Sequence, residues 1–155
     1  MGIEIERKFL VDGNDWRADA VGRRYRQGFL NTAKERTVRV RTDGTKGFLT
    51  VKGPSVGSVR TEFEYEIPVE DADAILEDLC EQPVIEKIRY RIPWGSHTWE
   101  VDEFLGENEG LVIAEIELSQ ANEPFEKPPW LGRDVTGDPR YYNANLVSHP
   151  YRQWE

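Results

Sequence analysis

Short segments in which ionic and apolar side chains alternate residue by residue recur along this chain. Residues two apart in a β-strand point to the same face, so each segment predicts a strand with one ionic face and one apolar face. The predicted strands are Gly2 to Leu10, Arg24 to Leu30, Glu35 to Thr42, Gly47 to Lys52, Arg60 to Ile67, Val84 to Ile92, Thr98 to Phe104 and Leu111 to Leu118.

Turn residues separate several of these strands. Asp43-Gly44 lies between the third and fourth, Gly53-Pro54 is predicted to end the fourth, and Pro93-Trp94-Gly95 separates the sixth and seventh. Residues 128–132, with two prolines and a glycine, predict an irregular connection.

Two segments have helical signals instead. Glu70 to Leu79 is acidic at its start and places apolar residues, among them Leu76 and Leu79, on one helical face. Asp138-Pro139 combines a capping residue with a first-turn proline, and it predicts a second helix through about Val147.

Length and composition limit the class of protein. A chain of 155 residues without a linker or repeat predicts a single domain, 1–155. Its first residues do not resemble an export signal, and no stretch reaches the ~20 apolar residues of a membrane span, so we expect a cytoplasmic protein. Cys80 is the only cysteine, which excludes an internal disulfide, and we expect it to be a small buried hydrophobe.

The formal net charge of −9 argues against a nucleic-acid polymer or an anionic membrane as partner. The chain nevertheless contains 20 Lys and Arg residues, concentrated in particular strands. Basic residues concentrated within an acidic protein favour a small polyanionic ligand.

The ionic faces separate the two signs of charge by strand. Acidic residues two apart are Glu4 and Glu6, Glu62 and Glu64, Glu100 and Asp102, and Glu115 and Glu117. Basic residues at the same spacing are Arg39 and Arg41, and Lys87 and Arg89, with Lys8, Lys52 and Arg60 on other strands. Side chains at this spacing lie about 6.5 to 7 Å apart, so like charges repel unless an opposite charge lies between them.

Two architectures fit this pattern. In the first, apolar faces pack together as a sandwich and the ionic faces form ion pairs in solvent. In the second, the sheet closes into a barrel whose ionic faces line a tunnel. Separation of the signs by strand favours the closed eight-stranded antiparallel β-barrel with flanking helices, of the α+β class. Carboxylates would then bind Mg²⁺ or Mn²⁺, and Arg and Lys would bind a polyphosphate.

The same residues resemble a known superfamily. Glu4-Ile5-Glu6-Arg7-Lys8 resembles the Glu-x-Glu-x-Lys signature of the CYTH, or triphosphate tunnel metalloenzyme, superfamily. The other charged pairs occur in the expected order, and residues 128–141 are similar to the tail of compact bacterial members. The resemblance implies an eight-stranded tunnel and an enzyme acting on tripolyphosphate, thiamine triphosphate, nucleoside triphosphates or RNA 5′-triphosphates, or cyclising ATP.

The resemblance also implies roles for individual residues. The expected catalytic residues are Glu4, Glu6, Lys8 and Glu117. The expected metal ligands are Glu4, Glu6, Glu115 and Glu117. The expected phosphate-binding residues are Lys8, Arg39, Arg41, Lys52, Arg60, Lys87 and Arg89, with supporting carboxylates at Glu62, Glu64, Glu100 and Asp102. Similar proteins often have tyrosine where this chain has Phe29, so that hydroxyl is missing here.

The favoured hypothesis is metal-dependent hydrolysis of inorganic tripolyphosphate to pyrophosphate and phosphate. A CYTH-type adenylate cyclase is the alternative within enzymes, although no base-recognition motif is visible. The alternatives from another class are a non-catalytic triphosphate-binding module and a barrel with surface ion pairs only. Related proteins often form homodimers, and the sequence leaves the oligomeric state open. His97 and His149 are expected at the surface, and Tyr90 and Trp99 in packing.

Overall fold

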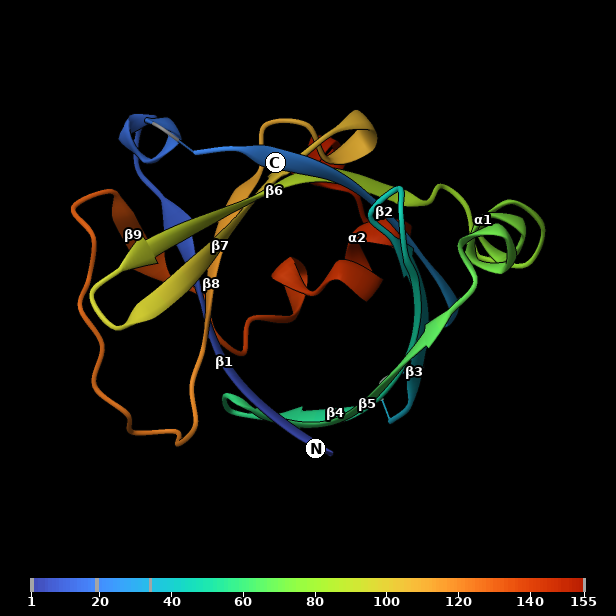
Figure 1. Ribbon diagram of the computed structural model, residues 1–155, viewed down its shortest axis with the longest axis horizontal. Helices are drawn as coiled ribbons and strands as arrows, with labels where there is room; N and C mark the ends of the chain where they lie inside the picture. The colour runs from blue at the N-terminus through green and yellow to red at the C-terminus, as the bar shows by residue number, and fades with distance from the viewer. Residues whose placement is uncertain (1, 19, 34, 155) are drawn as a thin grey trace.

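Eight antiparallel strands form a closed barrel in the computed structural model, which describes residues 2–18, 20–33 and 35–154 (Figure 1). The barrel strands are β1 (Ile3–Val11), β2 (Gly22–Asn31), β3 (Thr37–Thr42), β4 (Gly47–Val56), β5 (Val59–Ile67), β6 (Ile85–Trp94), β7 (His97–Phe104) and β8 (Val112–Glu117). They follow the order β5-β4-β3-β2-β6-β7-β8-β1, and pairing of β1 with β5 closes the ring. The predicted closed barrel is confirmed.

The charged faces point inward. Lys8, Arg39, Lys87 and Asp102 are buried, although each lies on the ionic face of its strand. A sandwich would have left these side chains in solvent, so the sandwich alternative is excluded. An ionic interior is tolerated because opposite charges lie close together along it.

The outer apolar face is covered only in part. Trp99 and Val101 are fully buried beneath the segment that includes Trp130. On the wall formed by β1, β4 and β5, however, Ile3, Phe63 and Tyr65 are 66%, 47% and 60% exposed. The helix that follows β5 packs against Val40 and Leu49 and leaves these three side chains exposed.

The β4–β5 hairpin is longer than predicted. β4 continues past Gly53-Pro54 to Val56, with an irregular register between Lys52 and Ser55. The turn is formed by Gly57 and Ser58, and Gly57 has φ of 62°, which glycine adopts without strain. Proline does not end this strand because the irregularity absorbs it.

A ninth strand was missed. β9 (Leu131–Asp134) pairs with β1 through Phe9 and Val11, and it begins within residues 128–132, which were predicted to be irregular. Its four residues, Leu-Gly-Arg-Asp, have no clear alternation, and the strand forms because β1 extends beyond the end of β5 and offers unpaired backbone groups.

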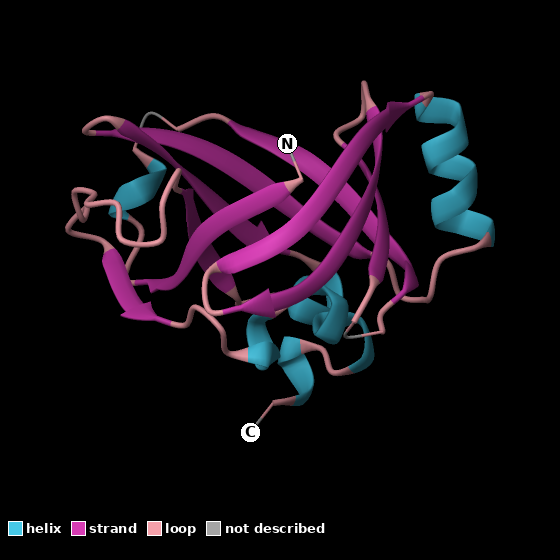
Figure 2. Ribbon diagram, turned by 90° about the horizontal axis from the view of Figure 1, so that it is seen from below, coloured by secondary structure: helices cyan, strands magenta, loops and turns pink. Residues whose placement is uncertain are grey.

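The predicted C-terminal helix is broken into short segments. A 3₁₀ turn η3 (Pro139–Tyr141) is followed by extended Tyr142, helix α2 (Asn143–Ser148) and a second turn η4 (Tyr151–Gln153). Asp138 caps the first turn as predicted, because its side chain accepts a hydrogen bond from the Arg140 backbone N–H. Figure 2 shows that these segments gather at one end of the barrel.

The C-terminal segments close that end through an apolar cluster. Leu146 and Val147 of α2 pack with side chains from inside the barrel, among them Phe29, Phe104 and Ile113. We call this the covered end, and the other end, where β1 begins and β8 finishes, the mouth. The barrel interior therefore ends in an apolar cluster at the covered end, and the ionic side chains begin directly beside it with Lys8 and Lys87.

Helix α1 (Val69–Asp78) lies against the outside of the barrel, as Figure 2 shows. Its Ala72 and Leu76 are fully buried against Val40, with Cys80 just beyond the helix. Leu79 follows the helix and is 66% exposed, so its predicted place on the buried face is wrong. Two further 3₁₀ turns are η1 (Asp15–Arg17) and η2 (Gly106–Asn108).

Candidate active site

A cavity of about 740 Å³ occupies the barrel interior. All eight barrel strands contribute side chains to its lining, as do residues between 136 and 145 of the C-terminal segment. Every residue that the sequence predicted for the site lines this cavity except Asp102, which is fully buried in the wall. The fold therefore brings together residues spread over more than a hundred positions of the chain.

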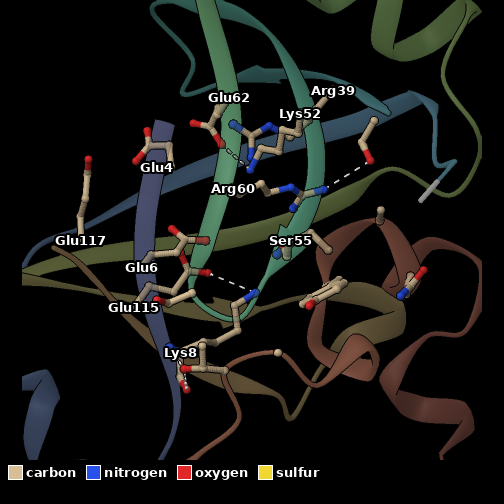
Figure 3. Close-up of a pocket in the computed structure, with 18 of the residues that line it drawn as sticks. Glu4, Glu6, Lys8, Arg39, Lys52, Ser55, Arg60, Glu62, Glu115 and Glu117 are labelled. Carbon is tan, nitrogen blue, oxygen red and sulfur yellow. Dashed lines mark hydrogen bonds and ion pairs between the residues drawn. The ribbon is translucent and has the colours of Figure 1, made fainter. Parts of the chain in front are cut away.

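Carboxylates gather along β1 and β8 (Figure 3). Glu4 and Glu6 lie on β1, and Glu117 of β8 is the register partner of Glu6. Burial, with Glu117 and Glu62 close by, raises the pKa of Glu4 to about 8. The nearby Glu115 carboxylate, followed by burial, raises the pKa of Glu6. These two carboxylates have too little positive charge around them, a state that a bound cation would relieve.

Glu62 and Glu115 differ from Glu4 and Glu6 because each already has a lysine as its ion-pair partner. Lys52 Nζ lies 2.9 Å from Glu62, and Lys8 Nζ lies 3.7 Å from Glu115. Burial alone would raise the pKa of both carboxyl groups, but the attraction of the lysines outweighs it and both values are lowered. Both stay ionised and hold their lysines at the cavity wall.

The basic side chains are also buried close to one another. Burial lowers the pKa of Lys52 and of Lys87 to about 8, and burial followed by repulsion from Arg41 lowers the pKa of Arg39 to about 10. The Nε atoms of Arg39 and Arg41 are buried and have no hydrogen-bond partner among the described residues. Buried cations with unused donors favour an anionic ligand.

Asp102 is the counter-ion that holds two of these cations. It accepts hydrogen bonds from Lys87 Nζ at 2.7 Å and from Arg89 Nε and Nη2 at 2.7 and 2.9 Å. The strong attraction of Arg89 and Lys87 overcomes burial and keeps the Asp102 pKa well below its ordinary value. Asp102 orients both basic side chains, and its place in the wall leaves it out of the cavity lining.

The remaining predicted residues also have defined partners. Arg60 Nε donates to the Gly53 carbonyl at 2.7 Å, and burial lowers the pKa of this arginine. Glu100 lies 3.3 Å from Arg89 and 3.0 Å from Arg91. Glu64 lies 3.5 Å from Arg39 and 3.6 Å from Arg41.

Sequence reasoning missed uncharged residues that contact the residues of the site. Tyr25 and Gln27 of β2 point into the barrel, and Gln27 Nε2 donates to Asn143 Oδ1 of α2 at 2.6 Å. Lys87 Nζ lies 3.5 Å from the same oxygen, and Lys8 Nζ donates to the Tyr141 carbonyl at 3.2 Å. Two-residue alternation along β2 could have indicated Tyr25 and Gln27, but no local signal connects Asn143 with this wall.

Several residues lie outside the site, as predicted. Trp99 is fully buried in packing on the outer face, and Tyr90 packs edge-on against Trp16. His149 directly follows α2. His97 was predicted to be a surface residue, but it is the first residue of β7 and its side chain is only 13% exposed, with Nε2 2.6 Å from Glu123.

No group of three or more His, Cys, Asp or Glu side chains within residues 2–18, 20–33 and 35–154 is arranged as a ready metal site. The carboxylates nevertheless fit a hard divalent cation, because Glu4, Glu6 and Glu117 offer only oxygen donors and the pKa values of Glu4 and Glu6 are raised, a shift that a bound cation would reverse. None of the helices described has the length and apolar character of a membrane span.

The fold and site define a class: a closed antiparallel barrel whose interior is lined with opposed carboxylates and basic side chains. The CYTH domain family matches residues 2–151, and the chain belongs to that family. The family predicted from the Glu-x-Glu-x-Lys motif is thereby confirmed.

Individual relatives agree with this assignment. The chain is 59% identical over 155 residues to the inorganic triphosphatase of Acetivibrio thermocellus, covering 100% of this chain and 99% of that protein. It is 38% identical over 150 residues to the inorganic triphosphatase of Nitrosomonas europaea, covering 93% and 96% of the two chains. A crystal structure of an inorganic triphosphatase superposes with a TM-score of 0.62 at 33% identity, covering 92% of this chain and 96% of that one.

Proposed function

We propose that this protein hydrolyses inorganic tripolyphosphate to pyrophosphate and phosphate with the help of Mg²⁺ or Mn²⁺. The main support is the division of charge inside the cavity. Uncompensated carboxylates on β1 face a wall of crowded cations with unused donors, so the site has places for a cation and for a polyanion together. Two relatives that align over nearly the whole chain are named inorganic triphosphatases.

The basic residues bind and orient the substrate. Arg39, Arg41, Lys52, Lys87 and Arg89 would contact phosphoryl oxygens and neutralise the charge that develops on the leaving group. Lys8 and Arg60 extend this set at the covered end and beside the β4–β5 hairpin. Asp102 keeps Lys87 and Arg89 in place, and Glu62 does the same for Lys52.

The acidic residues complete the chemistry. Glu4, Glu6, Glu115 and Glu117 would hold the metal, which when bound supplies positive charge to phosphoryl oxygens. The same carboxylates would orient the attacking water toward the terminal phosphorus. Glu64 and Glu100 support the arginines opposite.

The carboxylates also argue against a pure binding module. An anion binder would gain nothing from Glu4 and Glu6, whose negative charges repel a polyphosphate unless a cation lies between them. The predicted single domain, the cytoplasmic location and the exclusion of nucleic-acid and membrane partners stay predictions.

The test is product release from purified protein given tripolyphosphate, ATP or thiamine triphosphate, each with Mg²⁺, Mn²⁺ or a chelator. We expect metal-dependent phosphate release from tripolyphosphate that exceeds release from ATP. Cyclic AMP formation would instead support the cyclase alternative. Thermal stabilisation by tripolyphosphate without any turnover would leave a binding module.

A further inference from the structure

Arg41 differs from the other buried cations in how it is held. Its guanidinium lies 3.6 Å from Glu64, beyond hydrogen-bond distance, and its Nε has no partner. The described residues provide no side-chain hydrogen bond to it. Arg89, by contrast, uses its Nε and Nη2 donors on Asp102, at 2.7 and 2.9 Å. Arg41 therefore keeps its donors available while its side chain is only 14% exposed.

Two aromatic rings flank Arg41 instead. The guanidinium carbon lies 5.3 Å from the centre of the Tyr25 ring and 5.6 Å from the centre of the Phe48 ring. Tyr25 is on β2 and Phe48 is on β4, the two strands that pair with β3 on either side of Arg41. Phe48 is the direct register partner of Arg41, and Tyr25 is 7% exposed.

The rings support the arginine from the wall. Neither ring is among the described residues that line the cavity, whereas Arg41 is. A cation is attracted to the face of an aromatic ring, and this attraction uses none of the N–H groups that lie in the guanidinium plane. A carboxylate in the same place would consume those donors and neutralise the charge.

Tyr25 also brings two like charges together. The Arg89 guanidinium lies 5.3 Å from the same ring, so Tyr25 contacts two arginines that would otherwise repel each other. Arg89 is fixed by hydrogen bonds to Asp102, while Arg41 has only the two rings and the longer ion pair with Glu64. The aromatic residues are therefore of most consequence for Arg41.

We propose that Tyr25 and Phe48 are positioning residues that hold the Arg41 guanidinium at the cavity wall with its donors directed to a phosphoryl group. This inference rests on the proposed function of the cavity. It assigns a task to two uncharged residues of a site otherwise made of ionic ones.

The test is a double-mutant cycle on tripolyphosphate hydrolysis with Tyr25→Leu, Phe48→Leu and Arg41→Gln. Each leucine substitution removes a ring and keeps an apolar side chain, and we expect kcat/KM to fall about tenfold, mainly through a higher KM. In the Arg41→Gln background the same leucine substitutions should change kcat/KM less than about twofold, because the group they position is gone. Tyr25→Phe and Phe48→Tyr keep a ring and should restore most of the loss.

Two outcomes would overturn the inference. Either the leucine variants keep wild-type kcat/KM, or their loss persists at full size when Arg41 is absent. Phe48 is partly exposed, so Phe48→Leu remains informative if Tyr25→Leu melts at a lower temperature. Calorimetric titration of metal-free protein with tripolyphosphate measures the same contrast without turnover. A wild-type protein that binds but does not hydrolyse would thus refute the proposed function while leaving the positioning of Arg41 testable.

Discussion

Charged side chains have different surroundings at the mouth and at the covered end of the tunnel. At the mouth, Glu117 and Arg91 are exposed, and water screens whatever charge remains unpaired. At the covered end, Lys8 and Lys87 are buried and each has protein partners: Lys8 donates to the Tyr141 carbonyl and lies 3.7 Å from Glu115, and Lys87 donates to Asp102. The difference shows that one alternating pattern gives solvated charge where water enters and charge held by protein partners beside the apolar cluster.

Glu4 is partly buried, between the solvated charges of the mouth and the buried charges of the covered end. Its replacement should have the largest effect on turnover. Glu4→Gln removes a carboxylate whose pKa is raised to about 8 mainly by burial, so unfolding free energy should not fall. Loss of a proposed metal ligand should lower metal-dependent kcat by about a thousandfold. Phosphate release with saturating Mg²⁺ measures it, and Glu107→Gln, on an exposed turn, is the matched control. A folded Glu4→Gln protein with near-normal turnover would refute the assignment.

Packing at the covered end should have the next largest effect. Leu146 is fully buried in the cluster beneath the C-terminal segment, and Leu146→Ala should reduce the free energy of unfolding by about 2 to 4 kcal/mol. Phe63→Ala on the outer wall removes a larger side chain, but one that is 47% exposed, and should cost less. Urea denaturation measures both. Equal losses would mean that the covered end is no better packed than the open wall.

Arg89 and Arg91 allow a buried and an exposed positive charge to be compared on one strand. Both lie on the same face of β6, but the Arg89 side chain is 8% exposed and the Arg91 side chain 64%. Arg89→Ala should lower kcat/KM for tripolyphosphate about a hundredfold, and Arg91→Ala only about threefold, because solvent screens the exposed charge. Steady-state kinetics on both variants gives the ratio. A ratio near one would contradict the idea that burial makes these cations effective.

Most residues of the tunnel could be predicted from the sequence, because the alternation of charged and apolar residues is visible within each strand. The acidic pairs of β1 and β8 and the basic pair of β3 each indicate their inward face without knowledge of their neighbours. β9 was missed because four residues without alternation give no signal, and its formation depends on a free edge of β1. Asn143 was missed because only the folded chain brings α2 against Gln27.

The lowered pKa values of the two buried lysines predict that affinity for tripolyphosphate depends on pH, and this should be the smallest of the effects. Burial lowers the pKa of Lys52 and Lys87 to about 8, well below their ordinary 10.5. The charged groups that act on Lys52 are Arg39, Glu62 and Glu6, and those that act on Lys87 are Asp102, Arg89 and Glu115. Both lysines are protonated below about pH 8, so affinity for tripolyphosphate should be nearly constant up to pH 7 and fall as the pH rises through 8.

The decline should approach tenfold per pH unit for each lysine that must regain its proton on binding. Calorimetric titration of metal-free protein between pH 6.5 and 9.5, in buffers of different ionisation enthalpy, should show proton uptake near pH 8. The ligand-free protein should become more stable between pH 8 and 10.5, because there the unfolded chain binds more protons than the folded one. Lys52→Arg keeps its charge throughout this range and should flatten part of the profile. Constant affinity from pH 7 to 9 without proton uptake would show that neither lysine binds the phosphate chain, and would leave the arginines of the cavity as its binding residues.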